Sequence, residues 1–138
     1  MAKRDIRKVS YVVLQTDDMP GEGARLLKLL KKHKVKLLAI TAFPLEKGCQ
    51  VDQVPEDMDR LLAIEERLPW RLSKQKSGFL VQSRNDTGAL VPVFEQLSGA
   101  GINVTAIDAV ASGKNRYGAI FWVKPKDVAK AARLLGAT

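Results

Sequence analysis

The first quarter of the chain passes from a strand pattern to a helix pattern. Residues 8–16 are rich in β-branched and aromatic side chains, a composition typical of a β-strand. Residues 21–33 place apolar side chains at helical spacing and predict an amphipathic helix. The side chains expected to face the core are Ala24, Leu27 and Leu30. A short polar elbow, residues 17–20, joins the two elements.

The same strand, elbow and helix occur again in the second half of the chain. Gly88 lies 67 residues after Gly21, and at this offset residues 12–16 fall on residues 79–83. Identical pairs at the same offset are Gln15/Gln82, Ala39/Ala106, Ile40/Ile107 and Ala42/Ala109. Self-similarity at a fixed offset indicates a duplicated unit. We therefore expect two repeats, which are residues 1–77 and residues 78–138.

The rest of the first repeat predicts three further strands and a helix. Residues 36–44 form the second strand, and residues 48–54 form a third that is polar enough for a sheet edge. Pro55 is expected to open a helix and Pro69 to end it. The inward side chains of that helix are expected to be Met58, Leu61, Leu62 and Leu68. A fourth strand is predicted over residues 70–76.

The second repeat predicts the same elements apart from the last strand. Residues 78–83 form its first strand and residues 88–98 its first helix, with Leu90, Val93, Phe94 and Leu97 expected to face inward. A hairpin over residues 103–112 and 116–124 follows, and Pro125 opens the final helix. No counterpart of the fourth strand is found.

This order of elements predicts an α+β fold made of two tandem ferredoxin-like repeats. The first repeat reads βαββαβ and the second reads βαββα, so each is expected to form an antiparallel sheet with helices on one face. The strand that the second repeat lacks would leave a sheet edge open. An open edge can pair with another strand, so we expect this edge to join the other repeat or a second subunit.

The strand–elbow–helix segments at residues 12–40 and 79–107 resemble the ACT domain family. The family pattern is a polar Asn or Asp, a Pro-Gly pair, a helix, and a Gly-Ile-Asn entry into the second strand. The first segment carries Asp18, Pro20 and Gly21, and the second carries Asn85, Gly88 and the sequence Gly-Ile-Asn-Val at 101–104. The resemblance extends from about Val9 to Leu135, which identifies the chain as similar to proteins of two tandem ACT repeats.

Two positions depart from the family pattern. Thr87 stands where the proline of the second elbow would be, and residues 33–36 replace the Gly-Ile-Asn entry in the first repeat. Because the second repeat keeps both Asn85 and Asn103, it is the repeat in which a ligand is more expected.

ACT domains are regulatory modules that bind small ligands, most often amino acids. They commonly pair side by side and hold the ligand between the elbow of one module and the second strand of its neighbour. The resemblance implies a non-catalytic regulatory or sensor protein that binds an amino acid at the module interface without a cofactor. The residues implied to bind the ligand are Asp17, Asp18, Met19, Pro20, Gly21, Asn85, Asp86, Thr87, Gly88, Ala89, Asn103 and Val104.

The residues themselves offer a physical reason for a ligand at the elbows. A helix N-terminus presents unpaired N–H groups and a partial positive charge, which suit a carboxylate. Gly21 and Gly88 let the backbone approach a ligand closely. Asp18 in the first elbow, or Asn85 and Asp86 in the second, can accept from an ammonium group. The alternative interpretation is that Asp18, Asp86 and Thr87 are ordinary helix caps with no ligand role.

Composition limits the other possibilities. The chain is 46% hydrophobic and 28% charged, which is typical of a soluble globular protein. It has a single cysteine, Cys49, and no apolar run near the ~20 residues that a membrane span needs. We therefore expect a cytoplasmic protein with no membrane partner.

The net charge of +8 raises nucleic acid as an alternative partner. The densest basic stretch, residues 28–36, is better explained as a solvated helix end whose lysines complement the helix dipole. The RNA-recognition fold shares the βαββαβ order and stacks bases on aromatic side chains. Residues 116–124 resemble its third strand, but the aromatic spacing is shifted and only Tyr117 and Phe121 would share a face. An RNA-binding module is therefore kept as an alternative, and nucleic acid is not the expected partner.

Catalysis and metal binding have little support in the sequence. His33, the only histidine, lies in a lysine-rich helix end, and Cys49 has no partner base nearby. Asp17 and Asp18 lack the further oxygen ligands that a hard metal ion requires. We therefore predict no enzyme activity, no catalytic residue and no metal site.

The resemblance also implies a homodimer. Since no catalytic or DNA-binding segment accompanies the two repeats, a regulatory output would act on a separate partner protein in trans. A module that pairs with other proteins without any ligand is a further alternative.

Overall fold

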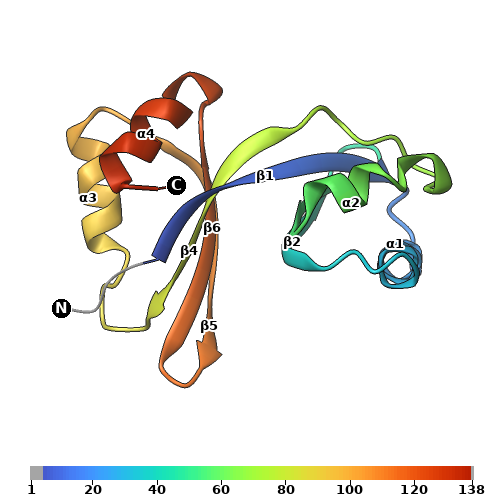
Figure 1. The fold of residues 1–138 in the computed structure, drawn as a ribbon, viewed down its shortest axis with the longest axis horizontal. Helices are drawn as coiled ribbons and strands as arrows, with labels where there is room; N and C mark the ends of the chain where they lie inside the picture. Colours follow the sequence, from blue (N-terminus) through green and yellow to red (C-terminus); the bar gives the residue numbers. More distant parts are fainter. Residues whose placement is uncertain (1–4, 138) are drawn as a thin grey trace. The chain divides into compact units, whose positions relative to one another are not determined.

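The computed structural model describes residues 5–137 and shows an α+β fold (Figure 1). Over these residues six strands form a sheet in the order β2-β3-β1-β4-β6-β5, and four α-helices accompany them. The described chain divides into two compact units. One unit is residues 10–76, and the other combines residues 5–9 with residues 77–137.

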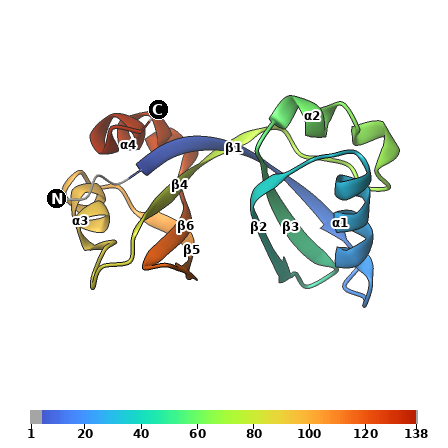
Figure 2. The same ribbon diagram turned by 60° about the horizontal axis from the view of Figure 1, so that its bottom comes forward.

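In the unit of residues 10–76, β1 (Asp5–Thr16) lies beside β3 (Cys49–Pro55), and β2 (Leu37–Pro44) pairs with the other side of β3. Both pairings are antiparallel. α1 (Glu22–Lys32) and α2 (Met58–Leu62) cover one face of these strands (Figure 2). The buried core between helices and strands is Val12, Leu14, Leu26, Leu30, Val35, Val51, Leu61, Ile64, Leu68 and Leu72.

β3 is an interior strand, so the prediction of an edge strand at residues 48–54 is wrong. It is hydrogen-bonded to β1 on one side and to β2 on the other, and residues 51–55 are all buried. Its polar side chains satisfy part of their hydrogen bonding locally, since the Gln50 amide donates to the Asp52 carboxylate at 2.9 Å. The edge of this unit is β2 instead.

The helix predicted to start at Pro55 begins later. Pro55 is the last residue of β3, and the helix α2 starts at Met58 after Asp57. The Asp57 carboxylate accepts from the Arg60 backbone N–H at 3.3 Å, so an aspartate cap, and not the proline, sets the start of this helix. A 3-10 turn, η1 (Glu65–Arg67), follows.

The fourth strand predicted over residues 70–76 is wrong. Residues 71–75 are not assigned to a strand, and β4 (Lys76–Arg84) begins at Lys76. The segment still runs beside β1, because the Ser73 N–H donates to the Val13 carbonyl at 2.8 Å and the Val13 N–H donates to the Ser73 Oγ at 2.9 Å.

The core face of α1 also differs from the prediction. Leu26 and Leu30 are buried, with 1% and 2% of their surface exposed, and Leu29 packs against the same core. Ala24 is exposed and Leu27 retains 49% of its surface, so only Leu30 of the predicted inward set is confirmed. The face of α1 that packs against the core is therefore shifted by about one residue from the face that the sequence predicted.

In the other unit, β4 pairs with β6 (Arg116–Val123), which pairs in turn with β5 (Val104–Gly113). α3 (Val91–Gly99) and α4 (Val128–Leu135) pack on one face of these strands, and a 3-10 turn, η2 (Pro125–Asp127), precedes α4. The buried core is Phe79, Val81, Val93, Leu97, Ile102, Tyr117, Ala119, Phe121, Val123 and Ala131.

The predicted hairpin of the second repeat is confirmed. β5 and β6 are joined through Lys114 and Asn115, whose φ angles are +53° and +54°. Two successive positive φ angles define the type I′ turn, whose twist matches that of antiparallel strands.

The strand that the second repeat lacks is supplied from the start of the chain. β1 is a neighbour of β4 in the sheet, and residues 5–9 belong to the same compact unit as β4. Ile6 packs against the core of that unit, whereas Val12 and Leu14 belong to the core of the unit of residues 10–76. One strand therefore serves both units, and the predicted open edge beside β4 is closed.

Deleting residues 1–9 tests this role of β1. We expect the amides of β4 and β6 to lose most of their protection from hydrogen exchange, because β4 loses its neighbouring strand. The amides of β2 and β3 should keep theirs, since Val12 to Thr16 still pair with β3. Equal loss of protection in both groups, measured by hydrogen exchange and mass spectrometry, would contradict this role.

Gly48 is a second position on which the fold depends. Its φ is +82°, and a Cβ at this position would lie 2.5 Å from the Thr16 carbonyl oxygen. We expect Gly48→Ala to lower the free energy of unfolding by roughly 2–3 kcal/mol, as measured by urea denaturation. Gly23→Ala is the matched control: its Cβ would meet open space in a helix, so this variant should be more stable by about 0.5–1 kcal/mol.

Candidate functional site

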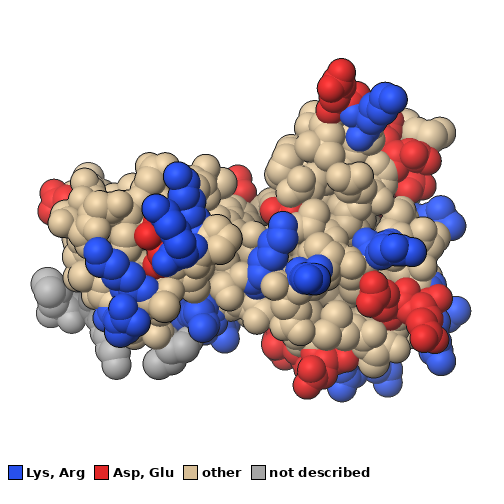
Figure 3. Space-filling view, turned by 90° about the horizontal axis from the view of Figure 1, so that it is seen from above, with Lys and Arg blue, Asp and Glu red and all other residues tan. Residues whose placement is uncertain are grey.

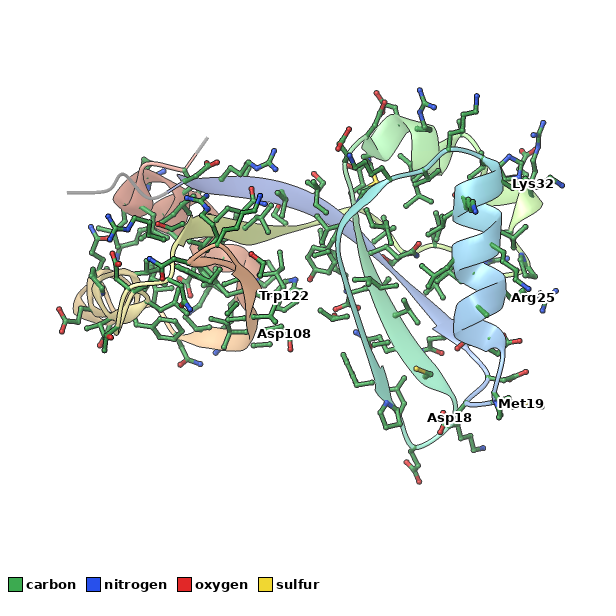
Figure 4. All side chains as sticks on the ribbon, turned by 90° about the horizontal axis from the view of Figure 1, so that it is seen from below. Asp18, Met19, Arg25, Lys32, Asp108 and Trp122 are labelled. Carbon is green, nitrogen blue, oxygen red and sulfur yellow. The ribbon has the colours of Figure 1, made fainter. Side chains whose placement is uncertain are left out.

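The first elbow, residues 17–21, joins β1 to α1, and each of its residues is exposed. Figure 4 shows Asp18 and Met19 at the N-terminal end of α1. Met19 keeps 64% of its surface exposed, although it is a large apolar side chain. These residues therefore lie beside the start of α1 without covering it.

Gly21 is the N-cap of α1. Its φ of +94° and ψ of −16° lie in the left-handed region that glycine adopts readily. Glycine has no side chain that can cap the helix, and no other described side chain takes over this role. The interpretation of Asp18 as the cap of α1 is therefore wrong.

The first turn of α1 keeps backbone donors available. The first N–H groups of any helix have no acceptor within the helix, and here the Glu22 N–H donates to the Met19 carbonyl at 3.3 Å. Gly23 and Ala24, the next two residues, are exposed. Two N–H groups and the positive end of the helix dipole thus face solvent beside Asp18, an arrangement that suits a carboxylate.

The second elbow, residues 85–89, satisfies its own backbone more fully. The Asn85 N–H donates to the Asn115 carbonyl at 2.8 Å, and the Ala89 N–H donates to the Asp86 carbonyl at 3.0 Å. The Asp86 carboxylate pairs with the Arg84 guanidinium at 3.1 Å, and both side chains are more than half exposed. The five residues are exposed or, at Ala89, half-buried.

α3 starts at Val91, three residues later than the predicted start at residue 88. Residues 87–90 form a turn, in which the Val91 N–H donates to the Gly88 carbonyl at 2.9 Å. Pro92 has no N–H, so the first turn of α3 offers fewer free donors than that of α1. Leu90 is the N-cap, and no described side chain caps this helix, so Asp86 and Thr87 are not its caps.

Asn103 and Val104 lie at the other end of α3 from the second elbow. They line a cavity of about 360 Å³ with residues from the C-terminal half of α3 and the loop that follows it. The nine-residue α3 spans about 13 Å at 1.5 Å per residue. The unit therefore does not bring Asn103 together with residues 85–89.

Sequence reasoning missed two cavities in the unit of residues 10–76, both lined by cations. One, of about 460 Å³, is lined by Arg25, Lys28, Leu29, Arg67, Leu68 and Pro69. Arg25 also lies over the Trp70 ring, 5.5 Å from its centroid, which fixes the guanidinium at the rim of this cavity. The other, of about 450 Å³, lies at the C-terminal end of α1.

The aromatic side chains of β6 do not form a platform for bases. Tyr117 and Phe121 lie in the core beneath α3 and α4, and Phe121 stacks on Phe79 with ring centroids 5.2 Å apart. Trp122 points to the other face of the strand but is only 7% exposed, and it packs against Gly78. The face drawn in Figure 3 mixes basic and acidic side chains. β6 thus lacks the exposed aromatic surface on which the RNA-recognition fold stacks bases.

Residues 5–137 contain neither a metal-binding cluster nor a membrane-spanning helix. These residues contain no group of three or more His, Cys, Asp and Glu side chains placed to hold a metal ion. In the same part of the chain, no helix is long and apolar enough to cross a membrane.

Comparison with known proteins gives structural similarity only. No protein-family model matches the chain, and no curated protein matches its sequence. The crystal structure of the protein BT0572 from Bacteroides thetaiotaomicron is similar at a TM-score of 0.78 and 16% identity, over 95% of this chain and 88% of that one.

Two regulatory subunits of aspartate kinase are similar over nearly their whole length. The subunit from Thermus thermophilus has a TM-score of 0.60 at 16% identity, and that from Thermus flavus has a TM-score of 0.58 at 19% identity. Each comparison covers 98% of this chain and 94% of the other. The chain therefore has an ACT-like α+β fold of the kind found in these regulatory subunits.

Proposed function

We propose that this protein is a non-catalytic regulatory protein that binds a small ligand, an amino acid, at its ACT-type elbows. The likeness to regulatory subunits of aspartate kinase supports a regulatory role. The observation that carries the proposal is the exposed, uncapped start of α1 beside Asp18.

An amino acid has a carboxylate and an ammonium group within a few ångströms of each other. The carboxylate fits the free N–H groups of Gly23 and Ala24, where the helix dipole adds a partial positive charge. The ammonium group fits the Asp18 carboxylate, and Met19 and Pro20 offer apolar surface to the ligand side chain. Gly21 leaves the approach open, because it carries no side chain.

The first repeat is the better candidate on physical grounds, although the sequence favoured the second. In the second elbow the backbone N–H groups of Asn85 and Ala89 are already bonded and Pro92 lacks one. A ligand there would instead use the side chains of Asn85 and Thr87, both of which are exposed.

A complete site needs a second module. Asn103 and Val104 lie away from the elbow of their own repeat, so we propose that they face the elbow of a neighbouring module in a homodimer. β2 and β5 are the outer strands of the described sheet, and each carries exposed apolar side chains next to its open edge. These side chains are Ile40, Phe43, Ile107 and Val110. Open edges of this kind support pairing between copies.

We propose a cytoplasmic location for the protein. Cys49 is a free, half-buried cysteine, which fits the reducing cytoplasm. The regulated protein is proposed to be a separate chain that binds when the ligand changes the module interface.

A thermal-shift screen with the common amino acids tests the proposal. A ligand at ~100 times its dissociation constant adds about 2.7 kcal/mol to stability, which raises the melting temperature visibly. We expect one or two amino acids to produce such a rise. If none does while the protein still dimerises, a ligand-free interaction module becomes the better explanation.

Gly23 allows the elbow to be tested without altering a side chain contact. Gly23→Pro removes one backbone donor at a helix position where α3 itself carries proline, so the fold should be retained. We expect this variant to weaken binding of the identified amino acid about tenfold or more, as measured by calorimetry. Gly23→Ala keeps the N–H and is the matched control, and it should bind within about twofold of the parent protein. Equal affinities for the proline and alanine variants would exclude the α1 elbow as the site.

A further inference from the structure

A second cavity lies at the opposite end of α1 from the elbow. Its volume is about 450 Å³, and it is a shallow cavity that opens widely to solvent. It is lined by Leu27, Leu30, Lys31, Lys34, Val35, Lys36 and Leu37. Four of these seven residues are apolar and three are lysines.

The same cavity exists in the other repeat. The cavity at the end of α3 is lined by Phe94, Leu97, Ser98, Gly101, Ile102, Asn103 and Val104. Each of these residues lies 67 positions after a residue that lines the cavity at α1. The two cavities are therefore equivalent features of the two repeats, and comparing them shows what has changed in one of them.

The apolar positions are alike and the polar positions are not. All four apolar residues at α1 have an apolar counterpart at α3. All three lysines have an uncharged counterpart, namely Ser98 for Lys31, Gly101 for Lys34 and Asn103 for Lys36. The two cavities share an apolar floor, but only the one at α1 has a cationic rim.

Lys34 occupies a backbone conformation that favours glycine. Its φ is +59°, while Gly101 at the equivalent position has a φ of +73°. Both residues end their helix in the same way: the Val35 N–H donates to the Leu30 carbonyl, and the Ile102 N–H donates to the Leu97 carbonyl, each at 2.9 Å. A side chain at this left-handed position is disfavoured relative to glycine. A lysine in this conformation lowers local stability, and residues held in unfavourable backbone conformations are common at functional sites.

The three ammonium groups have little competition from nearby acids. No Asp or Glu occurs between Glu22 and Glu46. The Lys36 ammonium lies 3.8 Å from the Glu56 carboxylate, but both side chains are more than half exposed, and such pairs are weak and readily exchanged. Three of the last four carbonyls of α1, those of Leu29, Leu30 and Lys31, already accept from backbone N–H groups.

We propose that this cavity binds a small phosphate monoester with an apolar body. The phosphate would lie among the ammonium groups of Lys31, Lys34 and Lys36, and the apolar body would cover the leucine and valine floor. Lysine binds phosphate as a point charge, and three ammonium groups supply more than the charge needed to neutralise a phosphate dianion. This site is separate from the elbow and does not depend on the function proposed above.

Phenyl phosphate is a direct probe of this site. In an NMR titration of the full-length protein, we expect it to shift the amide signals of residues 30–37 and to bind more tightly than inorganic phosphate or phenol. Inorganic phosphate tests the charge alone, and phenol tests the apolar floor alone. If benzoate binds as tightly as phenyl phosphate, or if the shifts map outside residues 27–37, the proposed phosphate site is overturned.

The second repeat supplies the residues for the decisive variant. The triple substitution Lys31→Ser, Lys34→Gly and Lys36→Asn gives the cavity at α1 the uncharged rim found at α3. We expect it to weaken binding of phenyl phosphate about tenfold or more. Lys32→Ser is the matched control, because Lys32 carries the same charge on the same helix (Figure 4). Lys32 is not one of the residues that line the cavity. If both variants weaken binding equally, the effect is one of general charge and the site is overturned.

Lys34→Gly alone separates function from stability. We expect the melting temperature to rise by roughly 3–6 °C, because glycine relieves the left-handed conformation, while affinity for phenyl phosphate falls. Amino-acid binding at the elbow should be unchanged, which distinguishes failure of this site from failure of the elbow. Steeply salt-dependent binding of an RNA oligonucleotide, weakened equally by Lys32→Ser and by Lys34→Gly, would overturn the small-ligand assignment in favour of a polyanion surface.

Discussion

The hydrogen bonding of β1 is the constraint on which the rest of the structure depends. Every backbone N–H and C=O of a buried strand needs a partner, and β1 finds its partners in both compact units. Residues 12–16 pair with β3, Val13 exchanges bonds with Ser73, and β4 lies along the strand as its other neighbour. Its side chains follow the same division, since Ile6 contacts one core and Val12 the other. One strand therefore contributes residues to both compact units.

The two predicted repeats share backbone features at the ends of their first helices but differ in the side chains found there. Both place a cavity where a helix ends and the next strand begins, and both close that helix with the same hydrogen bond. The elbows differ, because α1 begins at an uncapped glycine and α3 begins after a hydrogen-bonded turn with Pro92. In the first repeat, backbone N–H groups at the start of α1 and lysine side chains at its end are available to a ligand. In the second repeat, Pro92 removes one N–H group from the start of α3, and uncharged residues replace the lysines at its end.

The elements that sequence could predict were those with a strong local pattern. The β5–β6 hairpin and the approximate extents of β1 and α1 follow from periodicity and turn residues. β3 was predicted to be an edge strand because Gln50, Asp52 and Gln53 are polar residues that usually face solvent. In the structure Asp52 and Gln53 are buried, and Asp52 accepts from Gln50. The start of α2 is set by Asp57, a local capping signal, although Pro55 was expected to set it. The source of the last strand depends on contacts between distant segments, which no local pattern shows.

The candidate site was predictable only in part. The sequence located both elbows, but it could not show that Gly21 leaves α1 uncapped, nor that α3 starts three residues beyond Gly88. The lysine-lined cavity needed the tertiary structure to define it. The charge difference between the two repeats was nevertheless visible in their alignment, where Lys31, Lys34 and Lys36 fall on Ser98, Gly101 and Asn103.

The shared strand also limits how the two repeats can change over evolutionary time. Duplicated modules usually diverge independently, each under the demands of its own core and ligand. Here a substitution in β1 reaches both modules, so the strand must remain compatible with two cores at once. Residues outside β1 are free of this double demand. The C-terminal end of α1 is one such place, where three lysines stand against Ser98, Gly101 and Asn103 of the second repeat.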